Sequence, residues 1–299
     1  MNIQDQAGLN LTIADFGIAL SGLDVLEQKR GRYFLGYFLA ESCLSPGLTI
    51  KISNNGPIAD IPPKYHLFSS GSHWQLYQKN NQYYFKVIAR AKNGLFISRL
   101  AVFPKNFRSG KIHTYSPVGD REFPLTYPLD QLLLIHLAAL HQGILTHGCG
   151  ALLNGQGLLF IGSSGAGKST LGALLHNYRD ALILSDDRVM IRKKNDGWHI
   201  YGTPWQGTLP LFSAQRARLT RIFFLKKAKI NKISPLSGLE AMQRLVNFSF
   251  LPYWLKPYME KTLSTVFSLT QNNIFRELSF LPDKRVIPLI EDDLVVTPQ

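Results

Sequence analysis

The stretch from Leu158 to Leu171 constrains the fold of this chain more than any other part. An apolar run breaks into a glycine-rich turn, and a helix-forming segment follows, in the sequence LLFIGSSGAGKSTL. The pattern G-x-x-x-x-G-K-S in this setting predicts a buried strand, a phosphate-binding loop and a helix from about Lys168 to His176. The alternative is an ordinary strand-turn-helix with a surface lysine, which the complete motif disfavours. The sequence therefore predicts an α/β unit that binds a nucleotide.

Each residue type in the loop has a physical role. Gly162, Gly165 and Gly167 can adopt backbone angles that other residues avoid, so successive N–H groups can turn toward a phosphate chain. Lys168 supplies a point charge for the terminal phosphates, and Ser169 supplies a hydroxyl for a magnesium ion that bridges them. The positive N-terminal end of the helix adds to this attraction. The predicted nucleotide-binding residues are Gly162, Ser163, Ser164, Gly165, Ala166, Gly167, Lys168, Ser169 and Thr170.

Composition narrows the class of partner. The chain has 299 residues, 45% of them hydrophobic and 18% charged, which suits a globular protein of two domains. Its formal charge of +13 favours an acidic partner, such as a nucleotide, a nucleic acid, an anionic peptide or a membrane surface. Much of the excess follows the loop, but no basic helix with interleaved aromatic residues is present there. We therefore expect a solvated basic face around a nucleotide and no nucleic-acid partner.

The cysteines and the apolar segments indicate a compartment. Cys43 and Cys149 lack metal-type spacing, so both are predicted to be free thiols in a reducing environment. The first residues show no basic run followed by an apolar core, as a secretory signal would. The longest apolar helical run, 132–140, contains His136 and is too short to cross a bilayer. These features predict a cytoplasmic protein without a membrane partner.

The region before about Glu122 has the pattern of a small antiparallel sheet. Hairpin turns are predicted at Asn80-Asn81 and at 92–94, between runs rich in aromatic and β-branched residues. Periodicity leaves open whether 33–40 is a strand or a short helix. No nucleophile, metal cluster or repeat occurs in this region. It is predicted to be a β-rich domain over 1–126, either a docking surface for a substrate or a structural lid.

A proline-rich stretch, 115–128, is the best candidate for the linker to a second domain over 127–299. An apolar helix over 130–141 is expected next, buried under the sheet that follows it. The apolar run 144–153 and the pair Asn154-Gly155 then predict a hairpin that leads into the loop strand. His147 would lie on the strand beside that one. By default, a lone histidine in an apolar strand is a satisfied core residue.

Two adjacent acids follow another buried strand. The apolar run 181–185 ends directly in Asp186 and Asp187. Ligands bind at the carboxyl ends of strands in α/β sheets, so both acids should reach the edge that carries the loop. Successive residues of a strand point to opposite sides, so one carboxylate can face magnesium and the other an incoming acceptor. The alternative is an acidic turn that caps a helix or hairpin.

The remaining pattern contains one further loop of interest. A hairpin at 195–197 leads into Gly202-Thr-Pro-Trp-Gln-Gly207, where proline and glycines permit sharp turns. The tryptophan of this loop either packs, stacks on a base or positions a substrate. Arg188, Thr203 and Trp205 are the candidate substrate-contacting residues. A strand from Arg221, helices over 236–248 and 257–269, and a strand from Ile274 complete the prediction.

Three segments together carry a family resemblance. His147-Gly148, the loop 162–169 and Ser185-Asp-Asp-Arg-Val189 resemble the catalytic domain of HPr serine kinase/phosphorylase. The Gly-Thr-Pro-Trp loop is more similar to HPr-kinase-related proteins and to ATP-dependent phosphoenolpyruvate carboxykinases. The likeness covers about 128–299 and implies a P-loop kinase domain of that type, preceded by a smaller β-rich domain. It also implies that an aspartate of the pair acts on the acceptor serine while His147 supports it, and it allows a homo-oligomer.

The resemblance and the motifs together predict a phosphotransferase. ATP, or another phosphate donor, and magnesium would be its cofactors, and a serine or threonine of a protein or ribosomally made peptide its acceptor. Ser169 and Asp187 would hold magnesium while Asp186 takes the acceptor proton, although the two acids could exchange roles. Thr170 replaces an acidic residue of the family pattern, and the later glycine-rich segment linked to dephosphorylation is missing. We therefore do not expect phosphorylase activity.

Two other function classes fit the loop. One is a motor or transport ATPase, because residues 235–240 superficially resemble the signature of transport ATPases. In those proteins the signature shortly precedes the acidic pair, whereas in this chain Asp186 and Asp187 come before 235–240. A nucleotide-binding sensor without transferase activity would not need Lys168, Ser169 and both aspartates intact.

Overall fold

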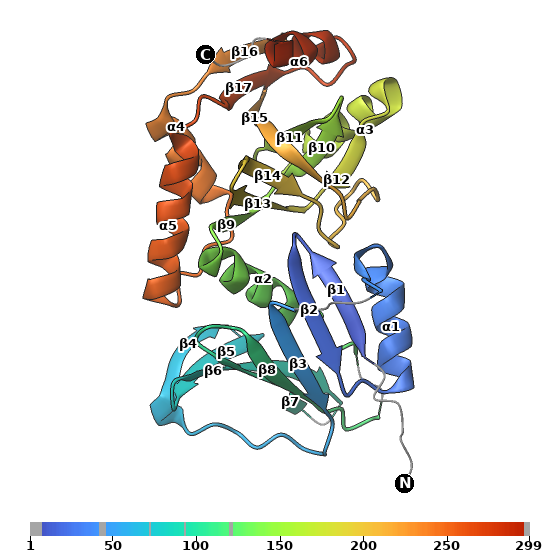
Figure 1. The fold of residues 1–299 in the computed structure, drawn as a ribbon, viewed down its shortest axis with the longest axis vertical. Helices are drawn as coiled ribbons and strands as arrows, with labels where there is room; N and C mark the ends of the chain where they lie inside the picture. Colours follow the sequence, from blue (N-terminus) through green and yellow to red (C-terminus); the bar gives the residue numbers. More distant parts are fainter. Residues whose placement is uncertain (1–7, 42–45, 72, 93, 120–121, 296–299) are drawn as a thin grey trace. The chain divides into compact units, whose positions relative to one another are not determined.

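The computed structural model describes residues 8–41, 46–71, 73–92, 94–119 and 122–295. The chain is a mixed α/β protein that forms two compact units, Met1–Leu137 and Ala138–Gln299 (Figure 1). Cys43 lies outside the described residues, and Cys149 is a buried free thiol. A docking role for the first unit and a catalytic role for the second stay predictions. Among the described residues, no helix has the length and apolar character needed to cross a membrane.

The first unit is built on a mixed sheet. Its described strands lie in the order β1-β2-β3-β8-β7-β6-β5-β4. Both predicted hairpins are confirmed, and Asn80 and Asn81 have the positive φ angles, 49° and 61°, of a tight β turn. The strands are β1 (Leu9–Ile13), β2 (Phe16–Ser21), β3 (Leu48–Ser53), β4 (His66–Ser70), β5 (Trp74–Lys79), β6 (Gln82–Ala91), β7 (Gly94–Pro104) and β8 (Ser109–Thr114).

The prediction of a wholly antiparallel sheet is wrong at two pairs, because β3 runs parallel to both β2 and β8. Between β2 and β3 the chain passes through helix α1 (Val25–Leu35) and the short 3₁₀ turn η1 (Gly36–Phe38). A helical crossover of this kind lets the next strand enter in the same direction as the last. The segment left open in the sequence is therefore helical up to Phe38.

A capping box starts α1. The Asp24 carboxylate accepts from the Glu27 backbone N–H at 2.8 Å, and the Glu27 carboxylate accepts from the Asp24 N–H at 2.9 Å. These contacts satisfy two of the N–H groups that a helix start leaves open. An acidic residue followed three positions later by Glu, as in Asp24 and Glu27, is a signal in the sequence that predicts the start of a helix rather than a strand.

The proline-rich stretch after β8 is tied to the first unit by one buried arginine. The Arg99 guanidinium donates to the carbonyls of Pro124 at 3.4 Å, Thr126 at 3.1 Å and Tyr127 at 2.8 Å. Burial lowers the pKa of Arg99, and the charge of Glu122 opposes this effect. Helix α2 (Leu129–Leu140) follows directly, as predicted.

Helix α2 places a histidine in the core of the first unit. The His136 ring is fully buried and stacks on Phe107 with ring centroids 4.8 Å apart, and it meets Phe85 edge-on at 5.4 Å. The sequence predicted burial of this helix under the sheet that follows it, and the face that carries His136 packs within the first unit. The apolar pattern of the helix fixes its burial and not its neighbour.

Acid is expected to destabilise the protein through His136. Burial lowers the pKa of His136 from 6.5 to about 4. Between pH 6.5 and pH 4, His136 is therefore protonated in the unfolded chain and neutral in the native state. The free energy of unfolding should therefore fall as pH drops from 7.5, by about 2 kcal/mol at pH 5 from this group. Urea unfolding of wild type and His136→Phe at both pH values measures it. Between pH 7.5 and pH 5, the free energy of unfolding should fall by about 2 kcal/mol less in His136→Phe than in wild type. Equal decreases in the two proteins would contradict the prediction.

The second unit contains the predicted strand, loop and helix. Its described strands lie in the order β12-β10-β11-β15-β14-β13-β9, and β17 pairs with β15 and β16 (Figure 1). The predicted hairpins β10–β11 and β13–β14 are confirmed. The strands are β9 (Gly143–His147), β10 (Cys149–Leu153), β11 (Gln156–Ile161), β12 (Leu182–Ser185), β13 (Arg188–Lys194), β14 (Gly197–Tyr201), β15 (Arg216–Lys227), β16 (Lys232–Pro235) and β17 (Phe275–Phe280).

Alternating residues of β11 build the two faces of this sheet. Leu158 and Phe160 pack in a cluster with α3 (Lys168–Arg179) and α6 (Val286–Val295). Leu159 and Ile161 pack in a second cluster with α4 (Gly238–Asn247) and α5 (Lys256–Thr270). The strand is thus buried on both sides, which explains its continuous apolar run.

The strand assignment of His147 is wrong in the sequence analysis. The apolar run 144–153 divides at Gly148 into β9 and β10, and only β10 pairs with the loop strand β11. His147 ends β9, whose ladder partner is β13, and it lies opposite Arg188. Thr146, His147 and Gly148 interrupt the apolar run, but this interruption does not tell which strand each half pairs with. His147 is therefore positioned by the strand that follows the acidic pair.

Four strands present their carboxyl ends at one edge. β10 runs antiparallel to both β11 and β12, so those two strands point the same way. β15 and β17 continue the parallel arrangement from β11. The glycine-rich loop after Ile161 and the acids after Ser185 therefore meet at this edge, as the sequence predicted.

Helix α6 is fixed to the sheet by a shared carboxylate. Asp293 accepts from Arg221 Nε at 2.8 Å and from Arg276 Nε at 3.0 Å. Arg221 is fully buried on β15, and Arg276 is buried on β17. The single carboxylate neutralises part of the charge of two buried guanidinium groups, which would otherwise be costly in the sheet.

Candidate active site

The glycine-rich loop turns at two glycines with positive φ angles. Gly165 and Gly167 have φ angles of +74° and +102°, which residues with a side chain rarely adopt. Gly167 is also the N-cap of α3 and offers no side-chain acceptor to the first helical N–H groups. These N–H groups stay available to an anion. Ser163, Ser164 and Gly165 are exposed at the turn.

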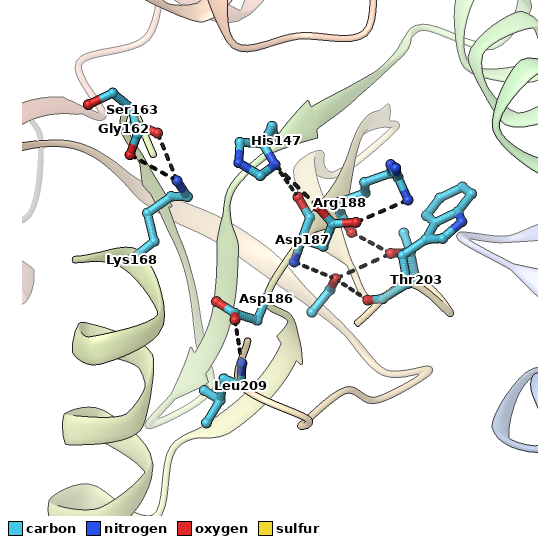
Figure 2. Close-up of polar contacts among 11 residues, drawn as sticks. His147, Gly162, Ser163, Lys168, Asp186, Asp187, Arg188, Thr203 and Leu209 are labelled. Carbon is cyan, nitrogen blue, oxygen red and sulfur yellow. Dashed lines mark hydrogen bonds and ion pairs between the residues drawn. The ribbon is translucent and has the colours of Figure 1, made fainter. Parts of the chain in front are cut away.

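Lys168 is folded back onto its own loop. Its ammonium donates to the Gly162 carbonyl at 2.8 Å and to the Ser163 carbonyl at 3.2 Å (Figure 2). Burial lowers the pKa of Lys168, and the negative charges of Asp186 and Asp187 oppose this effect. Ser169, half-buried, and Thr170, exposed, lie in the same first turn of α3. The loop thus holds its cation close to the acidic pair.

Asp186 faces the loop side and has one oxygen unused. Its side chain is buried, and Oδ2 accepts from the Leu209 N–H at 2.8 Å (Figure 2). Oδ1 is also buried and has no hydrogen-bond partner in the described part of the chain. Burial raises the pKa of the neighbouring Cys149 thiol, and the charge of Asp186 raises it further. A buried carboxylate oxygen without a donor is costly, so it calls for a cation or another ligand.

Asp187 faces a different set of partners. His147 Nδ1 lies 3.3 Å from its Oδ1, and an Arg188 guanidinium nitrogen lies 3.0 Å from its Oδ2 (Figure 2). Burial alone would raise the pKa of Asp187, but the hydrogen bond from His147 and the charge of Arg188 bring it below the usual value. The Asp187 side chain is 24% exposed, so a ligand can reach it.

The histidine has a defined tautomer. Nδ1 of His147 also lies 2.9 Å from the backbone carbonyl oxygen of Asp187. A carbonyl only accepts, so Nδ1 carries the proton and Nε2 stays available for other contacts. The His147 side chain is 41% exposed. The sequence default of a satisfied core histidine does not describe it.

The Gly-Thr-Pro-Trp loop is bonded to the acidic pair. The Thr203 hydroxyl donates to the Arg188 carbonyl, and the Ser185 hydroxyl donates to the Trp205 carbonyl at 2.9 Å. Ser185 also accepts from the Asp187 N–H at 3.3 Å. The Arg188 guanidinium lies over the Trp205 ring, 5.0 Å from its centroid. The candidate substrate residues Arg188, Thr203 and Trp205 therefore form one layer beside Asp187.

Three residues that contribute to the site were not predicted as site residues. Ser185 directly precedes the two acids, and its position at a strand end was the available signal. Leu209 acts through its backbone N–H, which leaves no mark in the sequence. Phe250 packs on Arg188 from the far side, 5.4 Å from ring centroid to guanidinium, and it is remote in the chain. Neither the Leu209 N–H nor the Phe250 ring could have been predicted without the fold.

Gly207 is expected to be needed for the placement of Asp186. A Cβ at Gly207 would lie 2.4 Å from the Asp186 carbonyl oxygen and 2.9 Å from its Oδ2. Gly207→Ala should therefore shift the carboxylate and lower any activity of the site about 100-fold, with the fold intact by circular dichroism. Gly36→Ala, whose Cβ meets nothing within 4 Å, is the matched control. Full activity of the Gly207 variant would contradict this geometry.

The site has oxygen donors on separate elements, at Asp186 and Ser169. No group of three or more histidine, cysteine or acidic side chains that could hold a metal occurs among the described residues. Magnesium is commonly held by one or two carboxylates together with substrate phosphates and water. The free Oδ1 of Asp186 and the hydroxyl of Ser169 are oxygen donors of that kind.

The chain was compared with protein families, curated proteins and solved structures. The model of the family described as SynChlorMet cassette protein ScmC matches residues 129–279, about half of the chain. No curated protein matches the sequence. Among solved structures, the HPr(Ser) kinase/phosphatase from Coxiella burnetii matches at 13% identity and a TM-score of 0.30, over 50% of this chain and 93% of that one. At this level of likeness no residue role is taken from that enzyme.

Proposed function

We propose that this chain, which belongs to the SynChlorMet cassette protein ScmC family, is a magnesium-dependent phosphotransferase. Its second unit would act as a P-loop kinase domain of the HPr kinase type. The donor is ATP or another phosphate donor, and the acceptor is a serine or threonine hydroxyl of a protein or ribosomally made peptide. One observation carries the proposal: a glycine-rich loop with its lysine shares a sheet edge with two acids in different environments.

The loop residues hold the donor in this proposal. The loop backbone N–H groups and those of the first turn of α3 would surround the phosphates, except the Ala166 N–H, which donates to the Ser163 carbonyl at 3.0 Å. Lys168 would leave its carbonyl partners to contact the outer phosphates. Asp186 and Ser169 would hold magnesium, which would supply positive charge to neutralise the phosphates. The buried Oδ1 of Asp186 supports this role for Asp186 rather than for Asp187.

Asp187 prepares the acceptor. The acceptor hydroxyl gives its proton to the Asp187 carboxylate as its oxygen attacks the outer phosphorus, while the bond from that phosphorus to the rest of the donor breaks. The His147 N–H and the Arg188 guanidinium hold the carboxylate in place and keep it ionised at neutral pH. A weak base suffices because the transition state of phosphoryl transfer needs little proton removal. Trp205 and Arg188 form the wall against which the acceptor lies.

The test separates three functions. Purified protein is incubated with ATP labelled in its terminal phosphate, magnesium and an extract of the source cells. Label in phosphoserine or phosphothreonine supports the proposal. Label released only as inorganic phosphate indicates a motor or transport ATPase, and label that stays in ATP indicates a sensor. Either of these two results would overturn a kinase.

We also propose that the acceptor docks on the first unit. A cavity of about 800 Å³ lies there, between the ends of β6 and β7 and the proline-rich stretch. Its lining is largely apolar, with Val87, Ile88, Phe96, Tyr115 and Val118. The charged residues of the lining are Arg90, Lys92, Arg99 and Glu122. This volume suits a side chain or short segment of a peptide. Because three of these charged residues are basic and one is acidic, the lining favours an acidic segment.

Val118→Arg is expected to weaken docking alone. Val118 is 77% exposed, so the change should not disturb the fold, and it places a bulky charge in the cavity. Transfer from labelled ATP to the extract acceptor should fall about tenfold at limiting acceptor, whereas ATP affinity should not change. Val25→Arg, at a 70% exposed position on α1, is the control. Equal transfer by both variants would place docking elsewhere.

A further inference from the structure

Strand β15 extends past the end of the loop strand. Ile161, the last residue of β11, pairs with Phe224, and β15 then continues through Leu225, Lys226 and Lys227. Leu225 comes close to the loop, since a Cβ on Gly162 would lie 3.3 Å from its carbonyl oxygen. The end of β15 is thus a wall of the phosphate-binding turn.

The pleat sends Lys227 and Lys226 to opposite sides. Leu225 packs in the cluster formed by the loop residue Ala166 and by α3. Residues i and i+2 of a strand share a face, so Lys227 lies on the loop side and Lys226 on the other. A Cβ built on Gly165 would lie 3.9 Å from the Lys227 ammonium. The Lys227 side chain therefore reaches over the centre of the loop.

The Lys227 ammonium is uncommitted. It is exposed, and within the described part of the chain it has no hydrogen-bond or ion-pair partner. Lys168, in contrast, already donates to two loop carbonyls. A free cation beside a glycine-rich turn that opens a helix N-terminus is complementary to a chain of phosphates.

We propose that Lys227 is a second phosphate-binding cation of this site, which contacts the polyphosphate chain of the donor from the β15 side. The inference rests on the proposed nucleotide site and adds a residue that no part of the glycine-rich motif predicts. Lys227 would neutralise charge on the phosphates while Lys168 contacts them from the helix side. Its role is positioning of the donor, so it should act on binding as well as on rate.

The experiment measures binding and not transfer. Calorimetric titration of the full-length protein with inorganic tripolyphosphate, ATP and adenosine is compared among wild type, Lys227→Gln, Lys227→Arg and Lys226→Gln. We expect Lys227→Gln to weaken tripolyphosphate and ATP about tenfold, and adenosine not at all. Lys227→Arg should keep wild-type affinity because it keeps the charge. Lys226→Gln, with the same charge change on the opposite side of the strand, should stay within about twofold of wild type.

The outcomes separate this inference from the proposed function. Equal affinity of Lys227→Gln and wild type, or equal losses in Lys227→Gln and Lys226→Gln, would overturn the role of Lys227 and leave the kinase proposal standing. A selective loss in Lys227→Gln, with no label passing from ATP to any hydroxyl, would support Lys227 and overturn the kinase. Absence of phosphate binding by wild type would overturn both.

Discussion

Asp187→Asn is expected to lower the single-turnover rate of phosphoryl transfer about 1,000-fold while ATP still binds. The amide cannot take the acceptor proton, and general bases at such positions contribute about 10² to 10⁴ in rate. Asn keeps the size of the side chain, so the layer formed by His147 and Arg188 should stay folded around it. Transfer from labelled ATP, with ATP affinity measured separately, tests the prediction.

Two comparison variants sharpen this test. Asp180→Asn changes an exposed acid in the left-handed C-cap of α3, a conformation that Asn tolerates, and it should transfer at the wild-type rate. Asp186→Asn should instead raise the magnesium concentration needed for half-maximal activity. The assignment of Asp187 as the base would be wrong if Asp187→Asn kept more than about a tenth of the wild-type rate. The roles of the two acids would be exchanged if Asp187→Asn, and not Asp186→Asn, raised the magnesium concentration needed for half-maximal activity.

Lys168→Ala is expected to weaken ATP about 100-fold and to abolish measurable transfer. The change removes a charge-assisted contact to the outer phosphates, worth about 3 kcal/mol where it is partly buried. It also removes the hydrogen bonds to the Gly162 and Ser163 carbonyls, which makes the empty loop looser. Titration calorimetry with ATP and single-turnover transfer measure both effects.

The control for Lys168→Ala is Lys226→Ala, which removes an exposed lysine from the same sheet edge. It should bind and transfer like wild type, since its side chain points away from the loop. Binding of ATP by Lys168→Ala at wild-type strength would show that the loop is not the donor site. Circular dichroism of both variants checks that the helix after the loop has formed.

Local pattern was sufficient for the core of the second unit. The strand, loop and helix from 158 to 171, both hairpins and the strand before Asp186 were all predictable, because each combines an apolar run with a strong turn or cap signal. The meeting of Gly162 and Asp186 at one edge also followed, from the rule that parallel strands carry their ligands at carboxyl ends. These features depend on short-range chemistry.

Long-range partners were not predictable. The change of strand partner at Gly148 moved His147 from the neighbourhood of β11 to that of β13, and the interruption of the apolar run there does not tell which strand each half pairs with. The parallel pairs around β3 depend on a crossover through α1. The backbone N–H of Leu209 on Asp186 and the Phe250 ring on Arg188 depend on loops far apart in the chain. Such contacts come from tertiary packing, which overrides local preference.

The carboxylate of Asp293 has a practical consequence for expression of shorter versions of the protein. A chain cut before α6 would leave the Arg221 and Arg276 guanidinium groups without their shared counterion, in a sheet that also loses the apolar cover of Val286, Ile287 and Ile290. Truncation at that point would give an aggregating product. A purification tag or fluorescent fusion therefore belongs after the helix, with a linker, and trimming of the C-terminal end should stop short of Asp293.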